Sequence, residues 1–403
     1  MKPGDVDLSD PATFADGPPH EYFRMLRAEA PVCWHREHKG GPGFFTITRY
    51  EDVKQISRDP ETFSSYEGGT NIDDPPSDDL TGMRAIMLNM DPPQHGKYRR
   101  IVQRSFTPRM VREMGPQVRE QARRIVDTVA PKGACEFVSE IAAELPMQVI
   151  CEMMGVPEED HRLVYDLSNR LIGFDDPEFQ ASRDDGKTAG LEMFMYAARF
   201  ADHVRANPGQ NLGTALLTGD VDGEGLDDLG FNSFFLLLSV AGNETTRTVT
   251  SHGMRLLIQH PEQRAKLLAD PSGIPAAIDE VVRHNPPVMY FRRTATCDTE
   301  LRGVPIKKGQ KVVMWYPSAN RDEEVFPDAD RFDVARGPNE HLAFGIGEHF
   351  CLGANLARLE LEIIFDELLR RIPDMQLAGP FRRLRSNFID GVKEMPVRFT
   401  PGG

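Results

Sequence analysis

The chain has 403 residues, of which 40% are hydrophobic and 27% charged, and its formal net charge at pH 7 is -15. This length exceeds the roughly 250 to 300 residues at which a single hydrophobic core usually stops growing, so we expect two subdomains or one large domain around a cofactor. The acidic balance excludes nucleic acid as the main partner, because phosphate binding requires a basic surface.

The N-terminal residues 1–17 are acidic and lack the apolar core of a signal peptide. No stretch approaches the roughly 20 apolar residues that span a bilayer, so we expect no membrane span. The five cysteines are widely spaced and contain no CxxC pair, which indicates neither a disulfide framework nor a zinc site. These features predict a protein of the reducing cytoplasm.

The first elements in chain order are a strand at residues 44–48 and a short helix at residues 51–57. Residues 64–82 are rich in Gly, Pro, Asp and Ser, which predicts a long loop. Apolar residues then recur at helical spacing through residues 94–124 and 138–154, with expected breaks at Pro108, Pro116 and Pro131. Helices should therefore dominate the N-terminal half.

A second polar break is expected at residues 173–187, and one long helix at residues 227–259. The middle of that helix contains Gly242, which costs about 1 kcal/mol relative to alanine. A glycine there opens a groove, and threonine hydroxyls can bond back to the preceding turn, so the helix can bend to admit a small molecule or water. The alternative is an ordinary buried helix with Glu244 on its solvent side.

Glu280 and Arg283 stand three residues apart on the next helical pattern and can pair, although exposed pairs of this spacing are common and contribute little. Residues 301–306 and 311–316 flank residues 307–310 and predict a hairpin. The fold class is therefore mainly α (α+β), with β-rich parts near residues 30–50 and 285–320 and helices elsewhere.

Near the C-terminus, FGIGEHFCLG at residues 344–353 places Cys351 where a glycine-rich turn enters a helix. Closely spaced glycines let the backbone approach a flat group, and the helix N-terminus favours a thiolate that can ligate iron. The alternative is a small buried cysteine in a surface turn. The spacing of Phe344, Gly347, Cys351 and Gly353, with His349, resembles the haem-thiolate motif of the cytochrome P-450 superfamily.

The resemblance covers essentially the whole chain and implies one domain, residues 1–403, around one buried haem b (iron protoporphyrin IX) ligated by Cys351. His95 and Arg99 resemble the HxxxR pair that binds haem propionates, for which cationic donors are suited. Arg292 remains a rival for Arg293 in that role. The implied cofactor contacts are Cys351, His95, Arg99, Arg293, His349, Phe344, Gly345, Gly353 and Ala241.

The run from Ala241 to Thr246 resembles the oxygen-activation motif of this superfamily. By that resemblance Gly242 and Thr245 take part in dioxygen activation, and Glu244 connects Thr245 to a proton supply. Glu280 and Arg283 resemble the ExxR element behind the haem, with Arg331 as its third member.

The resemblance implies a monooxygenase of the soluble bacterial type that inserts one oxygen atom from O2 into a hydrophobic small molecule, such as a methyl-branched lipid, a terpenoid or a steroid. An iron-sulfur ferredoxin and an NAD(P)H-dependent reductase would supply two electrons. Six basic and no acidic residues between Lys97 and Arg112 could form the docking face, or simply a solvated helix face.

Apolar segments implied to lie over the haem suit a hydrophobic substrate, although such residues are more often plain core. The same chemistry on a small aromatic compound, a peroxide-driven peroxygenase, and a non-enzymatic haem gas sensor or carrier are the alternatives. The predicted substrate pocket contains Met87, Leu171, Leu237, Val240, Val288, Met289 and Phe291.

Overall fold

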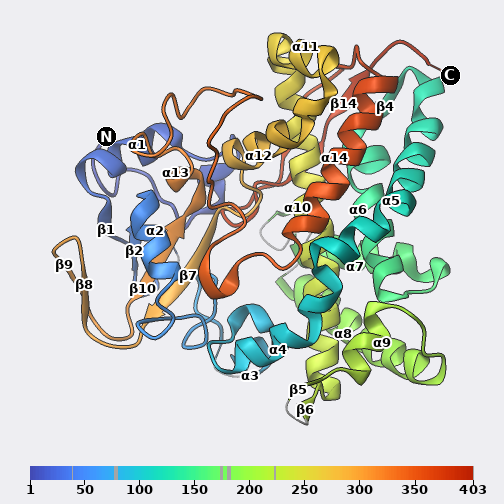
Figure 1. Ribbon diagram of the computed structural model, residues 1–403. Helices are drawn as coiled ribbons and strands as arrows, with labels where there is room; N and C mark the ends of the chain where they lie inside the picture. The colour runs from blue at the N-terminus through green and yellow to red at the C-terminus, as the bar shows by residue number, and fades with distance from the viewer. Residues whose placement is uncertain (39, 77–79, 173–175, 179–182, 222–223, 403) are drawn as a thin grey trace.

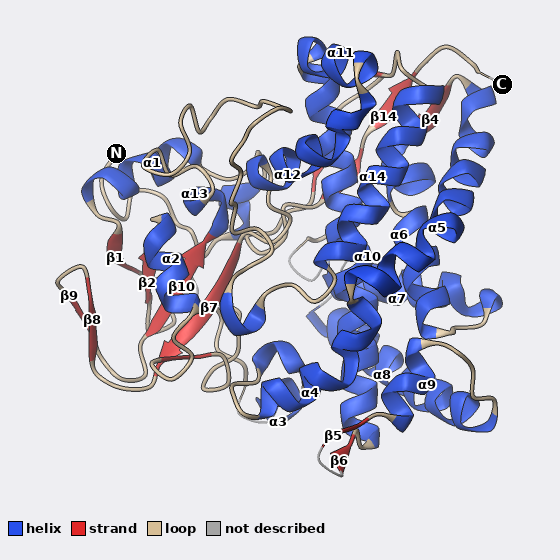
Figure 2. Ribbon diagram, viewed as in Figure 1, coloured by secondary structure: helices blue, strands red, loops and turns tan. Residues whose placement is uncertain are grey.

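The computed structural model describes residues 1–38, 40–76, 80–172, 176–178, 183–221 and 224–402. A sheet with the N-terminal helices forms one side of the molecule, and the longer helices form the other (Figure 1). Helices make up most of the chain and strands a smaller part, which confirms the predicted mainly α fold class (Figure 2).

The helices are numbered in chain order and range from one turn to nine turns. Their bounds are α1 His20–Glu29, α2 Tyr50–Ser57, α3 Leu80–Arg84, α4 Gln94–Val102, α5 Pro108–Val129, α6 Glu144–Met154, α7 His161–Ile172, α8 Arg183–Ala206, α9 Leu212–Thr218, α10 Asp228–Gln259, α11 Pro261–Ala269, α12 Ile274–His284, α13 Tyr316–Ala319 and α14 Ala354–Arg371. In the described residues no helix is both long and apolar enough to cross a membrane.

The main sheet has five strands in the order β1-β2-β10-β7-β3, and the remaining strands form smaller sheets. Within it β10 runs parallel to β2 and antiparallel to β7. The strand bounds are β1 Val32–His35, β2 Phe44–Ile47, β3 Phe63–Ser64, β4 Ala134–Glu136, β5 Asp220–Val221, β6 Glu224–Gly225, β7 Tyr290–Ala295, β8 Thr299–Leu301, β9 Val304–Ile306, β10 Lys311–Trp315, β11 Gln376–Leu377, β12 Arg382–Arg383, β13 Val392–Glu394 and β14 Pro396–Arg398.

Helix α10 is the centre of the helical part, where it contacts α6, α7, α8, α12 and α14. Its N-cap is Asp227, whose Oδ1 accepts a hydrogen bond of 2.7 Å from the backbone N–H of Gly230. The prediction of one long helix at residues 227–259 is confirmed. Because apolar side chains surround α10 on most sides, its middle is held inside the protein.

Three local predictions were wrong. Pro116 lies within α5 instead of ending a helix, and it is exposed, so water can reach the carbonyl that its missing N–H leaves free. The predicted hairpin around residues 307–310 is replaced by a β8–β9 hairpin. Its two turn residues, Arg302 and Gly303, have φ values of 50° and 79°, as tight hairpin turns require. Finally, residues 183–187 begin α8.

The predicted loop at residues 64–82 is anchored to the main sheet through Asp74. The Asp74 carboxylate lies 2.7 Å from Lys311 Nζ on β10 and 2.6 Å from Arg292 Nη1 on β7. Both cations are buried, and Lys311 also lies 2.8 Å from the Glu37 carboxylate. The loop is therefore fixed as far as Asp74, whereas residues 77–79 of it, like residues 173–175 and 179–182 of the predicted second break, lie outside the described residues.

Candidate active site

The turn before α14 holds Cys351 in a closely hydrogen-bonded backbone. The Cys351 N–H donates to the Phe344 carbonyl at 2.7 Å, and the Phe350 N–H donates to the Gly347 carbonyl at 3.1 Å. Gly347 has a φ of 76°, and a Cβ atom there would lie 2.5 Å from the Ser57 carbonyl oxygen of α2. Glycine is thus required at this position by both conformation and space.

Cys351 faces a cavity that also borders the middle of α10 and the inner end of β7. Its volume is about 250 Å³. Most of the predicted cofactor and catalytic residues meet around this cavity although they come from four separate parts of the chain, namely α4, α10, β7 and the turn before α14. They are His95, Arg99, Ala241, Gly242, Thr245, Arg293, Phe344, Gly345, His349, Cys351 and Gly353.

The electrostatics of Cys351 combine opposing effects. Burial raises the pKa of its thiol, whereas the Gly353 N–H and the charges of Arg99 and Arg358 act to lower it. The expected stabilisation of a thiolate by the start of α14 is thus outweighed by burial in the protein without a metal. Iron bound to the sulfur would change this balance, because a coordinating thiol is deprotonated.

Cationic and imidazole groups gather on one side of the cavity. Arg99 donates to the carbonyl oxygens of Glu348 and Phe350 at 3.3 and 2.7 Å, and Arg293 donates to the Arg292 carbonyl at 2.8 Å. Burial lowers the pKa of Arg99 and of Arg293, because a desolvated cation is costly. Both guanidinium groups are therefore suited to receive a bound carboxylate.

Two histidines complete this side. The rings of His95 and His349 lie 4.3 Å apart, and the buried Nδ1 of His95 has no hydrogen-bond partner in the described part of the chain. Burial, followed by the charge of Arg293, lowers the pKa of His349 well below its usual value. Both rings line the cavity, and Nε2 of His349 also lies 3.3 Å from the Ser65 hydroxyl. Arg292 points instead to Asp74, so the structure distinguishes Arg293 from its rival.

The middle of α10 presents small side chains to the cavity. Ala241 is exposed although its helix is buried, because it faces this space. The Thr245 hydroxyl donates to the Ala241 carbonyl at 2.8 Å, which confirms the expected bond to the preceding turn. Gly242 has a second role, since a Cβ atom there would lie 3.3 Å from the Ile150 side chain of α6.

Glu244 does not line the cavity. It is 1% exposed and forms an ion pair with Arg247, one turn along α10, and its Oε1 lies 3.3 Å from the Thr248 hydroxyl. Arg247 in turn donates to the Asn169 side chain of α7 at 2.7 Å. Burial opposes the charge of Arg247, but Glu244 raises its pKa. The sequence analysis missed Arg247, although its i,i+3 spacing from Glu244 was a visible signal.

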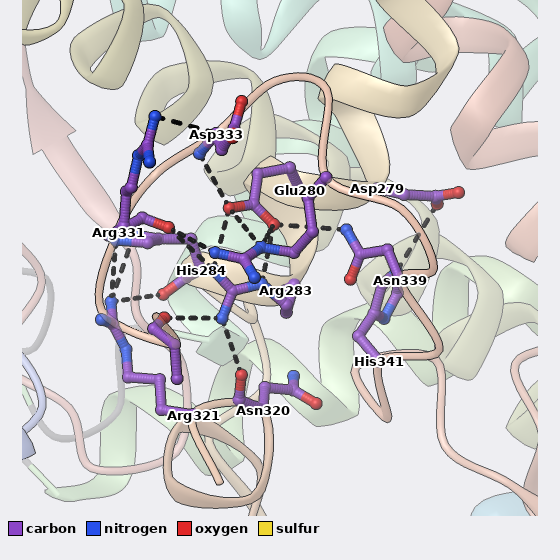
Figure 3. A network of polar contacts seen from close by, with 12 residues as sticks. Asp279, Glu280, Arg283, His284, Asn320, Arg321, Arg331, Asp333, Asn339 and His341 are labelled. Atoms are coloured by element: carbon purple, nitrogen blue, oxygen red, sulfur yellow. Dashed lines mark hydrogen bonds and ion pairs between the residues drawn. The ribbon is translucent and has the colours of Figure 1, made fainter. Parts of the chain in front are cut away.

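Behind the cysteine turn, Glu280 and Arg283 form a fully buried pair, with Nε–Oε2 and Nη2–Oε1 distances of 2.7 and 2.8 Å (Figure 3). The prediction that Arg331 is the third member was wrong, because its side chain is 61% exposed and lies near Asp333. Arg336 takes this place, with its Nε 3.1 Å from both Glu280 oxygens. Arg336 follows Arg331 by five residues, and the path of the chain between them brings Arg336, not Arg331, to Glu280.

The apolar wall of the cavity contains four of the seven predicted pocket residues, Met87, Leu237, Val288 and Phe291. The other three do not line it. Met289 is buried beside Tyr290 and Trp315, Val240 packs against Leu384 and Ile389, and Leu171 packs against the main core. Lining residues that the prediction omitted include Thr246, Val249, Tyr316 and Glu360.

A flat tetrapyrrole fits this donor set. Cys351 offers a sulfur ligand, and a Cβ atom added at Gly353 would meet nothing within 4 Å, so the space beside the sulfur is open. Ala241 and Gly242 provide a smooth opposite wall, and the two arginines with the two histidines match a pair of propionates.

A family model described as cytochrome P450 matches residues 274–372. The chain is 42% identical to a steroid C26-monooxygenase of Rhodococcus jostii, over 98% of this chain and 85% of that protein. It is also 42% identical to a methyl-branched lipid omega-hydroxylase of Mycobacterium tuberculosis, over 94% and 90% of the two chains. The structure resembles a Mycobacterium marinum cytochrome P450 in complex with pseudoionone, with a TM-score of 0.92, 39% identity and coverage of 99% and 100%. These similarities extend over the walls of the cavity as well as the cysteine turn.

Proposed function

Because this chain belongs to the cytochrome P450 family of haem b monooxygenases, we propose that it hydroxylates a neutral, lipid- or steroid-like molecule with Cys351 as the iron ligand. The observation that carries this proposal is the meeting of Cys351, Thr245 and the cationic group of Arg99 and Arg293 around one cavity. Haem held by a thiolate supplies the reductive activation of dioxygen.

The residues of this chain divide the remaining tasks. Arg99, Arg293, His95 and His349 would hold the propionates and so orient the haem in the cavity. The Thr245 hydroxyl, which now donates to the Ala241 carbonyl, would turn to hold a proton at Oγ1 near the reacting oxygen. Glu244 is buried beside Thr245 on α10, and after leaving Arg247 it would take up a proton from water and pass it on to the Thr245 hydroxyl.

The apolar wall supports a hydrophobic substrate. In the described residues, the charged groups of the lining lie near Cys351 and the propionate side or on α14, whereas α10, β7 and the segment at Met87 contribute apolar side chains. A substrate carboxylate would thus find no cation opposite Thr245 within this described lining. The names of the relatives, which refer to steroids and methyl-branched lipids, agree with this substrate class.

The first test concerns the ligand. In the Cys351→Ser variant, the reduced protein treated with carbon monoxide should lose the long-wavelength band typical of a thiolate-bound haem. Cys297→Ser, at an exposed cysteine, is the matched control and should keep it. If Cys351→Ser keeps the band, the proposed ligand is wrong.

The second test concerns the substrate. A panel of sterols, methyl-branched lipids, terpenes and small aromatics should be screened for the spin-state change that accompanies displacement of the distal water. We expect sterols or branched lipids to bind most tightly, with product analysis showing hydroxylation. Tightest binding by charged or small aromatic compounds would contradict the proposed substrate class.

We also propose that an acidic iron-sulfur ferredoxin, reduced by an NAD(P)H-dependent reductase, delivers the electrons in the cytoplasm. Arg104 and Arg112 are exposed on the segment that contains Phe106, which lines the same cavity as Cys351. Phe350, which directly precedes Cys351, is 42% exposed. Such a face, basic with an apolar centre, suits an acidic partner. Arg99 is not part of it, because its side chain lines the cavity.

Reduction kinetics with a ferredoxin test this docking face. The Arg104→Glu/Arg112→Glu variant should be reduced at least tenfold more slowly at low salt, with unchanged substrate affinity. The Arg36→Glu/Arg199→Glu variant makes the same charge change at exposed positions on other elements and should behave like the wild type. Equal rates in the two variants across a salt series would refute the proposed face.

A further inference from the structure

One cation is held against the cysteine turn from the side of α12. Arg358, in the second turn of α14, donates from Nε to Asp279 Oδ1 at 2.9 Å. Its guanidinium carbon lies 4.5 Å from the centroid of the Phe344 ring. Both Arg358 and Asp279 side chains are 33% exposed. The guanidinium is thus fixed by an ion pair and an aromatic ring together.

This cation is geometrically coupled to the sulfur position. Phe344, whose ring lies under Arg358, accepts the backbone hydrogen bond of Cys351 through its carbonyl. Arg358 follows Cys351 by seven residues and lies in the second turn of α14, which begins three residues after Cys351. His341 supports the arrangement, since its Nε2 lies 3.5 Å from Asp279 Oδ1 (Figure 3). The centroid of its ring lies 5.6 Å from that of the Phe344 ring.

The charges around Arg358 have opposite signs. Asp279 from α12 and Glu362, one turn further along α14, face the guanidinium from the protein side. Arg99 approaches the cysteine turn from α4 and adds a second positive charge. If Arg358 were neutral, the carboxylates of Asp279 and Glu362 would act on the turn without compensation.

We propose that Arg358, positioned by Asp279, raises the reduction potential of the haem iron by stabilising the negative charge gained when the iron is reduced. The electron that converts ferric to ferrous haem adds one negative charge to the iron-thiolate group, and a fixed cation nearby favours that state. The inference rests on the proposed role of Cys351 as the ligand. Arg358 acts through the field at the sulfur and is a positioning residue.

The test is a spectroelectrochemical titration of the holoenzyme without substrate. In Arg358→Gln, the ferrous-to-ferric ratio at a given potential should fall about tenfold, equivalent to a shift of about 59 mV for one electron. Arg358→Lys keeps the charge and should recover part of the shift. Asp279→Asn removes the opposing charge and should shift the potential upward, and the double variant should lie between the two single variants.

Arg371→Gln is the control. Arg371 ends the same helix, pairs with Asp127 at 2.8 Å, and is about 20 Å further along the helix axis than Arg358. The reduction potential of the haem iron should therefore be unchanged in this variant. An unchanged potential in Arg358→Gln, or shifts of the same sign in Arg358→Gln and Asp279→Asn, would overturn the inference. Failure of the proposed Cys351 ligand would be distinguishable from failure of this inference. It would show in the carbon monoxide spectrum of the Cys351→Ser variant, whatever the reduction potentials of the Arg358 variants.

Discussion

Replacing Arg336 by Met removes the cation that completes the buried network around Glu280. The Arg336 side chain is 10% exposed, and Glu280 is fully buried. Besides both Glu280 oxygens, the guanidinium binds the carbonyl oxygens of Pro327, Asp328 and Arg331 at 2.7, 3.0 and 2.9 Å. The substitution would thus leave a buried carboxylate and three carbonyl groups of the segment before the cysteine turn without this donor.

The expected loss in the free energy of unfolding follows from the partners that Glu280 keeps. Breaking a buried ion pair from one side typically costs about 3–5 kcal/mol. Glu280 keeps Arg283, the Asp333 N–H at 3.0 Å and the Asn339 side chain at 3.3 Å, so we expect the lower end, about 3 kcal/mol. Arg331→Met removes an exposed side chain of the same type and should change the free energy of unfolding by less than about 0.5 kcal/mol.

Urea unfolding of the holoenzyme, followed by haem absorbance and far-ultraviolet circular dichroism, measures the difference. Both variants should be compared at the same haem loading, because bound cofactor shifts apparent stability. If Arg336→Met is no less stable than Arg331→Met, the network does not depend on Arg336 and the geometric reasoning is refuted.

The remaining predictions concern three other positions. Thr245→Ala should still bind haem, but at least half of the electrons from NADH should appear as peroxide or water instead of product; unchanged product per NADH would contradict the proton-holding role. Val288→Phe should weaken sterol binding about tenfold in a spin-state titration by filling the cavity, while a small ligand such as imidazole binds as before. Burial opposes ionisation of Asp74, but Lys311 and Arg292 lower its pKa, so the stability that it contributes is present above about pH 4 and is lost as the pH falls through the folded-state pKa. In the Asp74→Asn variant, this part of the acid-induced loss of stability should therefore be absent from a pH series of urea unfolding midpoints. A pH profile identical to that of the wild type would exclude the contribution of Asp74.

Local features were predictable from the sequence. The turn at Cys351, the helix around Gly242 and the pair of Glu280 and Arg283 each depend on residues within one turn or one helix, so their spacing predicted the local contacts. The expected place of the pair behind a haem followed only from the resemblance to the cytochrome P-450 superfamily. The hydrogen bond from Thr245 to the preceding turn belongs to the same class.

Contacts between distant segments were not predictable in the same way. Arg331 and Arg336 lie in one irregular segment, and only its path past α12 decides which guanidinium meets Glu280. Likewise β10 follows β9 closely in the sequence but pairs with β2 and β7, because the sheet provides longer partners. Met289 was expected in the pocket, yet it is buried in a cluster with Tyr290 and Trp315, whereas Val288 before it and Phe291 after it line the cavity.

Strand β7 carries two neighbouring arginines whose side chains serve opposite faces. Arg292 forms an ion pair with Asp74 in the segment that precedes residues 77–79. Arg293 lines the cavity on the side proposed for the propionates. Consecutive residues of a strand cannot move independently, since they share one pleated backbone. The contact that fixes Asp74 and the arginine that would hold a haem propionate are therefore joined through adjacent residues of β7, so a displacement of one is transmitted to the other through a single peptide unit.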